Sequence, residues 1–144
     1  MLVATKTIRF DAAHILTNHK GLCKNLHGHT YRVEVSATGS DANDMVVDFK
    51  ELKALAEEFI VSRFDHVFMF DATSPGEREI AAVVEKHGMR TVSLPFRTTA
   101  ENLAHHFFDT LAPHLTDGAR LLSVRVWETQ DSVATYTPEA GETS

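Results

Sequence analysis

The stretch CKNLHGH, residues 23–29, gathers side chains that can bind a metal ion or move a proton. His27 and His29 are two residues apart, so in a strand both imidazoles point to the same side. His14 ends an earlier apolar segment, and an antiparallel pairing would bring it beside them. Three neutral imidazoles with a fourth position open are typical of a catalytic zinc site. The spacing leaves one alternative open, namely surface or hydrogen-bonded histidines.

Cys23 is the only cysteine, so it cannot form an internal disulfide, which fits a reducing compartment. A lone cysteine is often a small buried apolar residue. Lysines on both sides, Lys20 and Lys24, favour an accessible thiol here. A thiol near a bound cation loses its proton readily and can serve as a base.

Two further groups could carry acid–base chemistry. Glu128 follows Val124 and Val126 at strand spacing, which places a carboxylate on an apolar side where it needs a partner. Its alternative is an exposed acid at a strand end. Asp65-His66 can exchange a proton near neutral pH, or can simply form a turn that ends a helix. The remaining histidines lack such partners and are interpreted as solvated or capping residues: His19, His87, His105, His106 and His114.

The composition bounds the class of protein. The chain has 144 residues, which predicts a single domain over 1–144. A net charge of −6 argues against nucleic acid or an anionic membrane as a partner. The polar start excludes a signal-peptide core, and no apolar run approaches the roughly 18–20 residues of a membrane helix. We expect a cytoplasmic protein.

Alternation of apolar and polar residues predicts four strands, at 2–12, 28–39, 121–129 and 132–137. A loop of about a dozen residues, which holds Cys23, joins the first two strands, and loops of this length tend to be functional.

Capping residues and apolar stripes predict three helices. They begin at Asp48, at Ser74-Pro75 and at Thr98 or Thr99, and they end near Arg63, at Gly88 and before Pro113. Thr98-x-x-Glu101 matches a capping box, and TVSLPF is a possible short strand. The order predicts an α+β fold, a four-stranded antiparallel sheet with helices on one face, and a frayed tail at 138–144.

Five motifs, FDAAH, CKNLHGH, FDH, TTAEN and VWET, occur in this order between about residues 3 and 130. Together they resemble the 6-pyruvoyl-tetrahydropterin synthase and 6-carboxytetrahydropterin synthase family. The resemblance implies the tunnelling fold (T-fold), 7,8-dihydroneopterin triphosphate as substrate, and homohexamers with active sites between subunits. It implies zinc ligands His14, His27 and His29, catalytic residues Cys23, Asp65, His66 and Glu128, and pterin-binding residues Glu128, Glu101 and Thr99.

The chain departs from the family in two places. Thr98 stands where the family usually has a proline, and it still supplies a helix cap in this interpretation. Residues 71–95 look like an insertion relative to compact bacterial members, which affects the rim of the pocket.

Three functions compete. The first choice is the carboxytetrahydropterin branch, which feeds queuosine and other 7-deazapurines, because only Lys24-Asn25-Leu26 separates Cys23 from His27, as in that branch. The second is the pyruvoyl branch, which leads to tetrahydrobiopterin. The third is a non-catalytic pterin- or zinc-binding module, which would not need the thiol.

Overall fold

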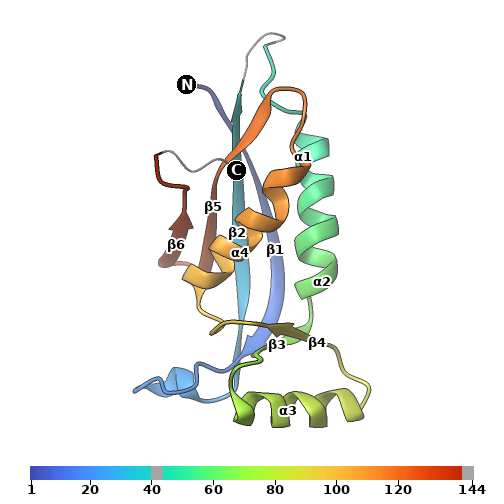
Figure 1. Cartoon of the computed structure of the whole chain (residues 1–144), viewed down its shortest axis with the longest axis vertical. Helices are drawn as coiled ribbons and strands as arrows, with labels where there is room; N and C mark the ends of the chain where they lie inside the picture. Colours follow the sequence, from blue (N-terminus) through green and yellow to red (C-terminus); the bar gives the residue numbers. More distant parts are fainter. Residues whose placement is uncertain (40–43, 141–144) are drawn as a thin grey trace.

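The structure, a computed structural model, describes residues 1–39 and 44–140, and its centre is one six-stranded sheet (Figure 1). The strand order across the sheet is β4-β3-β1-β2-β5-β6. In chain order the strands are β1 (Val3–His14), β2 (His27–Gly39), β3 (Val67–Asp71), β4 (Thr91–Leu94), β5 (Ala119–Thr129) and β6 (Ser132–Tyr136).

The four predicted strands are confirmed as β1, β2, β5 and β6, and neighbours among them pair antiparallel. Along β2 the odd-numbered residues Tyr31, Val33 and Val35 are fully buried, as their alternation with polar residues indicated. β1 continues two residues beyond the predicted end, so His14 lies within the strand.

The prediction of a four-stranded antiparallel sheet is wrong because two short strands extend it. β3 pairs parallel with β1, and β4 pairs parallel with β3. All five residues of β3 are buried, and a strand buried on both faces lacks the alternation that identifies a half-buried strand. The possible strand in TVSLPF is confirmed as β4.

The expectation that helices cover only one face is also wrong. Helix α3 (Pro75–Lys86) connects β3 to β4. Val67 and Met69 of β3 belong to the main core, whereas Phe68 and Phe70 pack with Ala81 of α3 in a second core. Since neighbouring residues of a strand point to opposite faces, α3 lies on the other side of β3 from the main core.

The first predicted helix is confirmed, with a π-helical segment inside it. It comprises α1 (Phe49–Ala56), the π segment Glu57–Val61 and α2 (Ser62–Phe64). The Asp48 side chain caps it by accepting a hydrogen bond from the Lys50 N–H. Four residues at i, i+4 spacing form its buried stripe: Leu52, Ala56, Ile60 and Phe64.

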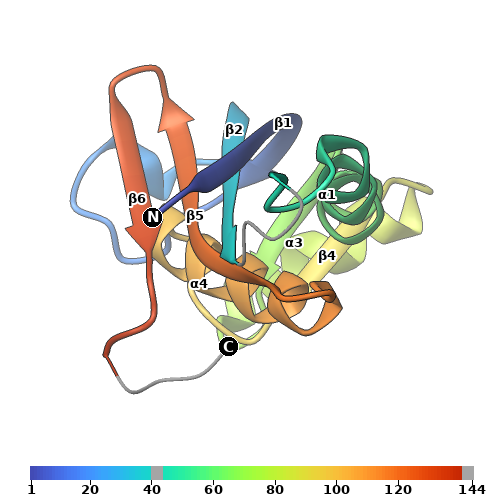
Figure 2. The ribbon, with the colours of Figure 1, turned by 90° about the horizontal axis from the view of Figure 1, so that it is seen from above.

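Helix α4 (Ala100–Leu111) crosses the same face of the long strands as α1 (Figure 2). Its predicted stripe of Leu103, Phe107 and Leu111 is buried. Its cap is Thr99, whose hydroxyl accepts a hydrogen bond from the Asn102 N–H. The predicted Thr98–Glu101 capping box is therefore wrong, because the Thr98 hydroxyl is buried next to His14 instead.

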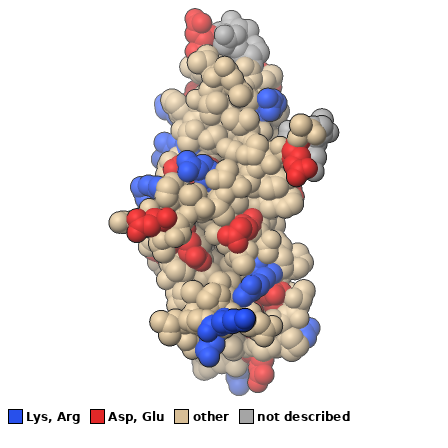
Figure 3. All heavy atoms as spheres, turned by 90° about the vertical axis from the view of Figure 1, so that its left-hand side faces the viewer, with Lys and Arg blue, Asp and Glu red and all other residues tan. Residues whose placement is uncertain are grey.

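Within residues 1–39 and 44–140, no helix is both long and apolar enough to cross a membrane. On the face in Figure 3, acidic and basic side chains are interspersed. Residues 137–140 follow β6 without helix or strand, and the rest of the predicted frayed tail, 141–144, lies outside the described residues.

Candidate metal centre

Three histidines meet where β1 ends and β2 begins. His14 lies directly opposite His27 in the antiparallel register, and His29 is two residues farther along β2 on the same side. The Nε2 atoms of His14 and His27 are 3.1 Å apart. The ring centroids of His29 lie 5.3 Å from His14 and 4.9 Å from His27. The register thus brings together the three residues that the sequence singled out.

Backbone carbonyls orient two of these rings. His14 Nδ1 lies 2.8 Å from the Thr98 carbonyl oxygen, and His27 Nδ1 lies 2.7 Å from the Asn25 carbonyl oxygen. Only an N–H can donate to a carbonyl, so each Nδ1 carries the proton and each Nε2 presents a lone pair. Such carbonyl partners are typical of metal-binding histidines.

Two lone pairs facing each other at 3.1 Å repel unless a cation lies between them. Nitrogen ligands of a tetrahedral zinc ion are about 3.3 Å apart, so the pair is already close to ligand spacing. His14, His27 and His29 form a group whose ligand atoms all lie within 4.8 Å of one another. The donor set therefore fits a metal ion.

Burial favours the neutral form of two of these imidazoles. It is the main reason why the pKa of His14 is lowered to about 4; the Thr98 hydrogen bond opposes this shift, and the neighbouring His27 and His29 contribute to it. Burial also lowers the pKa of His29, while Glu128 opposes that shift. Neutral imidazole is the form that binds metal, so these side chains are ready to bind one near neutral pH.

Glu128 projects to the histidines from β5. Its Oε1 is 3.4 Å from Nε2 of both His14 and His29, and its side chain is 25% exposed. The buried His29 Nε2 has no shorter hydrogen bond among the described residues, so this approach is an electrostatic contact. The predicted position on the apolar side is the one that the structure shows, and the carboxylate borders the metal centre.

Cys23 lies in the loop between β1 and β2, in the short 3-10 helix Leu22–Lys24. The Leu16 N–H donates to the Cys23 carbonyl oxygen at 3.0 Å, which ties the cysteine to the segment just after His14. The free thiol is half-buried. It lies outside the histidine group, so the structure shows a thiol on the connection beside the centre and not a fourth ligand.

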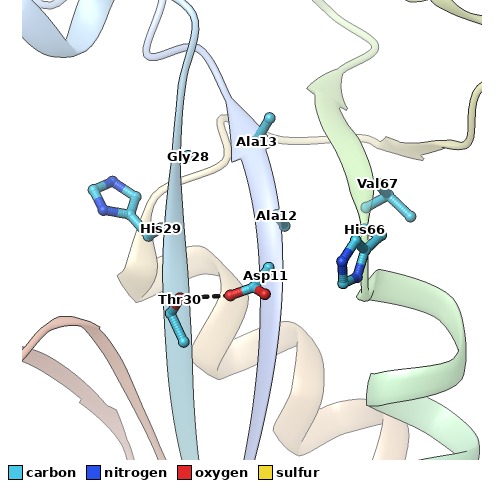
Figure 4. Close-up of a pocket in the computed structure, with 8 residues that line it drawn as sticks. All are labelled: Asp11, Ala12, Ala13, Gly28, His29, Thr30, His66 and Val67. Atoms are coloured by element: carbon cyan, nitrogen blue, oxygen red, sulfur yellow. Dashed lines mark hydrogen bonds between the residues drawn. The ribbon is translucent and has the colours of Figure 1, made fainter.

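Asp65 and His66 form a second cluster with Asp11. Figure 4 shows Asp11 and His66 of this cluster. Asp65 Oδ1 accepts from the Asp11 N–H at 2.9 Å and lies 3.0 Å from His66 Nδ1. The Asp11 hydrogen bond is the main cause that lowers the Asp65 pKa, and His66 adds to it. His66 has a left-handed backbone, with φ of 59°, and its N–H donates to the Asp11 carbonyl.

This second cluster borders a hollow of about 500 Å³ at β1, β2 and the start of β3. Asp11 alternates with the buried Phe10 and Ala12 along β1, so its side chain lies on the opposite face of the sheet from His14. Thr30 on β2 holds it there through a hydrogen bond of 2.5 Å to the Asp11 carboxylate. The Asp11 carboxylate, beside which Asp65 and His66 lie, is therefore on the other face of the sheet from the His14 ring, and His29 borders the same hollow as His66 (Figure 4).

Thr99 and Glu101 make no contact with the histidines in the described part of the chain. Thr99 caps α4, and Glu101 is exposed in the first turn of that helix. The residue that does reach the centre from this segment is Thr98, although its sequence pattern predicts a helix cap. Asp11 and Asn25 were also missed, because their roles depend on backbone groups and on strand register.

Sequence comparisons all match the chain to one protein family. The family model for 6-pyruvoyl tetrahydropterin synthase matches residues 4–139. A Haemophilus influenzae protein named 6-carboxy-5,6,7,8-tetrahydropterin synthase is 39% identical over 141 residues, which cover 94% of this chain and 99% of that protein. An Aquifex aeolicus protein of the same name is 37% identical over 159 residues, covering 94% and 97%.

Solved structures share the fold at lower identity. An uncharacterized protein from Wolinella succinogenes superposes with a TM-score of 0.76 and 21% identity, covering 96% of this chain and 100% of that one. The 6-pyruvoyl tetrahydropterin synthase of Plasmodium vivax gives a TM-score of 0.72 and 18% identity, covering 96% and 99%.

Proposed function

The chain belongs to the 6-pyruvoyl tetrahydropterin synthase family, and from this premise we propose that it is a zinc-dependent 6-carboxytetrahydropterin synthase. The reaction converts 7,8-dihydroneopterin triphosphate and one water to 6-carboxy-5,6,7,8-tetrahydropterin, acetaldehyde and triphosphate. Relatives above 30% identity with nearly full coverage carry the name of this activity. The lone free cysteine supports a reducing, cytoplasmic setting.

The observation that carries the proposal is that three imidazole rings converge, with ligand atoms within 4.8 Å of one another, and that two of the rings are oriented by carbonyls at Nδ1. His14, His27 and His29 would hold the zinc ion. When bound, zinc supplies Lewis-acid stabilisation of the negative charge that develops on the oxygens of the substrate side chain.

The protein side chains supply binding and proton transfer. The Cys23 thiolate accepts a proton from a side-chain carbon that carries a hydroxyl group. Glu128, at the border of the histidine centre, accepts two parallel N–H groups from the amino-pyrimidinone edge of the pterin. A non-catalytic binding module would need neither the thiol nor the acid–base pair.

His66 and Asp65 complete the acid–base set from another copy of the chain. They lie beside the Asp11 carboxylate, on the face of the sheet away from the His14 ring, so we infer that they act on a substrate held by a neighbouring subunit. The sheet ends in β4 and β6, and association protects such open edges. These features support a homo-oligomer, which we propose to be a hexamer, with active sites between subunits.

Thr99 and Glu101 have a smaller part in this proposal. They follow Thr98, whose carbonyl fixes His14, so they line the approach to the centre and assist pterin binding. The short Cys23–His27 spacing favours the carboxy product over the pyruvoyl product, because small changes in the placement of a base can redirect a reaction. The product would feed 7-deazapurine synthesis, including queuosine.

The experiment is a product analysis. Purified, zinc-loaded protein is incubated with 7,8-dihydroneopterin triphosphate, and the pterin products are identified by mass spectrometry. A coupled alcohol-dehydrogenase assay detects acetaldehyde. We expect acetaldehyde and the 6-carboxy product in equal amounts. Consumption of substrate with accumulation of 6-pyruvoyl-tetrahydropterin would identify the other branch, and no consumption would favour a binding module.

A further inference from the structure

Glu77, in the first turn of α3, is a carboxylate with only 1% of its surface exposed. It lies in the 71–95 segment, outside the site described above. Burying a charged group is costly unless it is hydrogen-bonded, and both oxygens of this one are. Oε2 accepts from the Thr17 hydroxyl at 2.6 Å, and Oε1 accepts from the Asp71 N–H at 3.1 Å.

These bonds differ from those of an ordinary helix cap. Ser74-Pro-Gly-Glu77 has the sequence of a capping box, in which the glutamate would accept from the Ser74 N–H. In the structure the Ser74 N–H donates to the Asp71 carbonyl instead. The Ser74 hydroxyl caps the helix by accepting from the Glu77 N–H. The Glu77 carboxylate is thus free to bind two segments outside its own helix.

One of those segments carries the thiol. Thr17 lies in the connection between β1 and β2, next to Leu16, whose N–H donates to the Cys23 carbonyl at 3.0 Å. Figure 1 shows this connection (blue) and α3 at the same end of the molecule. The contacts therefore run from Glu77 to Thr17, and from the adjacent Leu16 to Cys23.

Packing reinforces this connection on the same side. Ile15 is 7% exposed and belongs to the second core with Phe68, Phe70 and Ala81. Two of these partners come from β3 and one from α3. The segment that follows His14 therefore rests on α3 and β3 through apolar contacts, and the Thr17–Glu77 hydrogen bond adds a partly buried polar contact.

We propose that Glu77 is a positioning residue that, through Thr17, fixes the 15–26 loop and thereby the place of Cys23 beside the histidine centre. This inference rests on the proposed function for the catalytic role of the thiol. It gives the 71–95 segment a structural role, because α3 supplies both the Glu77 carboxylate and Ala81 of the second core, against which the loop packs.

The test uses Thr17→Val, which replaces the hydroxyl with a methyl group, and Thr17→Ser, which keeps the hydroxyl. Ser74→Ala is the matched control, because it removes the hydrogen bond between the Ser74 hydroxyl and the Glu77 N–H and weakens the cap of α3, while the Thr17–Glu77 hydrogen bond is kept. Cys23 is the only cysteine, so its alkylation by iodoacetamide is followed directly by mass. Hydrogen exchange of residues 15–26, zinc content, kcat and KM are measured on the same zinc-loaded samples.

We expect Thr17→Val to speed alkylation and loop exchange several-fold and to lower kcat on the order of 10–100-fold, with zinc content and KM little changed. Thr17→Ser should resemble the wild type, and Ser74→Ala should leave the loop unchanged. Unaltered alkylation and exchange in Thr17→Val, or equal changes in Ser74→Ala, would overturn the proposal. Should Thr17→Val fail to fold, Glu77→Gln replaces it under the same comparison.

Alkylation and hydrogen exchange do not depend on turnover. If the wild type has no activity on the pterin substrate, the proposed function fails while the loop measurements still decide the role of Glu77. If activity is present but the loop does not respond to Thr17→Val, only the positioning role fails.

Discussion

His27 links the two strands of the candidate metal centre, because its Nε2 lies 3.1 Å from that of His14 and its Nδ1 is held by the Asn25 carbonyl. We predict about one zinc per chain in the wild type and loss of the metal in His27→Ala. His19→Ala is the control, since His19 is exposed and its ring accepts a hydrogen bond from the Gly21 N–H, away from the histidine group. The zinc content is measured by mass spectrometry. Full zinc occupancy in His27→Ala would show that His27 is not a zinc ligand.

The role of the Cys23 thiol can be tested separately from metal binding, because Cys23 lies outside the histidine group. Cys23→Ala should keep its zinc and its thermal unfolding temperature, while turnover falls by roughly 10²–10⁴-fold, the usual contribution of a general base. Initial rates of acetaldehyde release, compared at equal zinc content, provide the measurement. Near wild-type turnover would show that another group removes the proton.

At the scale of residues, the alternation of side chains along a strand correctly predicted the face of the sheet on which His27, His29 and Glu128 lie. It could not identify the carbonyl groups that orient the rings, because every residue has a backbone carbonyl and the sequence does not say which one faces a histidine. Thr98 illustrates this limit. A capping pattern explained it locally, whereas its burial against His14 arises from packing between segments 84 residues apart.

At the scale of elements, the sequence predicted the strands with one polar face and the helices with one apolar stripe. It missed β3, in which five successive residues are buried. A short continuous apolar run carries no period that separates a strand from a helix segment. The side on which α3 packs was missed for the same reason, since Phe68 and Phe70 face away from the main core.

His106 of α4 gives the element-scale prediction. It lies among Phe64, Phe96 and Phe107, and its buried Nε2 has no hydrogen-bond partner in the described chain. Burial lowers its pKa, with Arg63 and His105 lowering it further and Asp109 opposing them. The unfolded chain therefore binds a proton near pH 6.5 while the folded chain does not, so this histidine destabilises the fold as the pH falls below that value.

We predict that the stability of His106→Phe relative to the wild type increases as the pH is lowered from 7.5 to 5.5. At the acidic limit, each unit by which the pKa is lowered corresponds to about 1.4 kcal/mol. Urea unfolding at several pH values provides the measurement, and His19→Gln serves as the control at an exposed position. A difference between His106→Phe and wild type that is independent of pH would contradict the prediction.

At the scale of the whole molecule, the sheet separates side chains that the proposed reaction needs in one active site. The His14 ring lies on the core face of the sheet and Glu128 approaches it from β5, whereas Asp65 and His66 lie beside the Asp11 carboxylate, which is on the other face. The sequence motifs identified both groups but not the faces of the sheet on which they lie, because sequence order does not fix the face of a residue outside a strand. A site shared between copies reconciles the two positions.

Mixing two inactive variants tests this arrangement directly. Cys23→Ala keeps His66, and His66→Ala keeps Cys23, so a site between one chain of each type contains both intact residues. With random assembly at equal amounts, about one quarter of such shared sites are complete, and we predict about that fraction of wild-type activity after co-expression or reassembly.

Cys23→Ala mixed with His27→Ala is the control, because Cys23 and the histidines belong to the same chain's site and no mixture completes it. Recovery in the first mixture alone would show that Asp65-His66 acts across the interface. If neither mixture is active although native mass spectrometry verifies mixed oligomers, the whole reaction takes place within one chain.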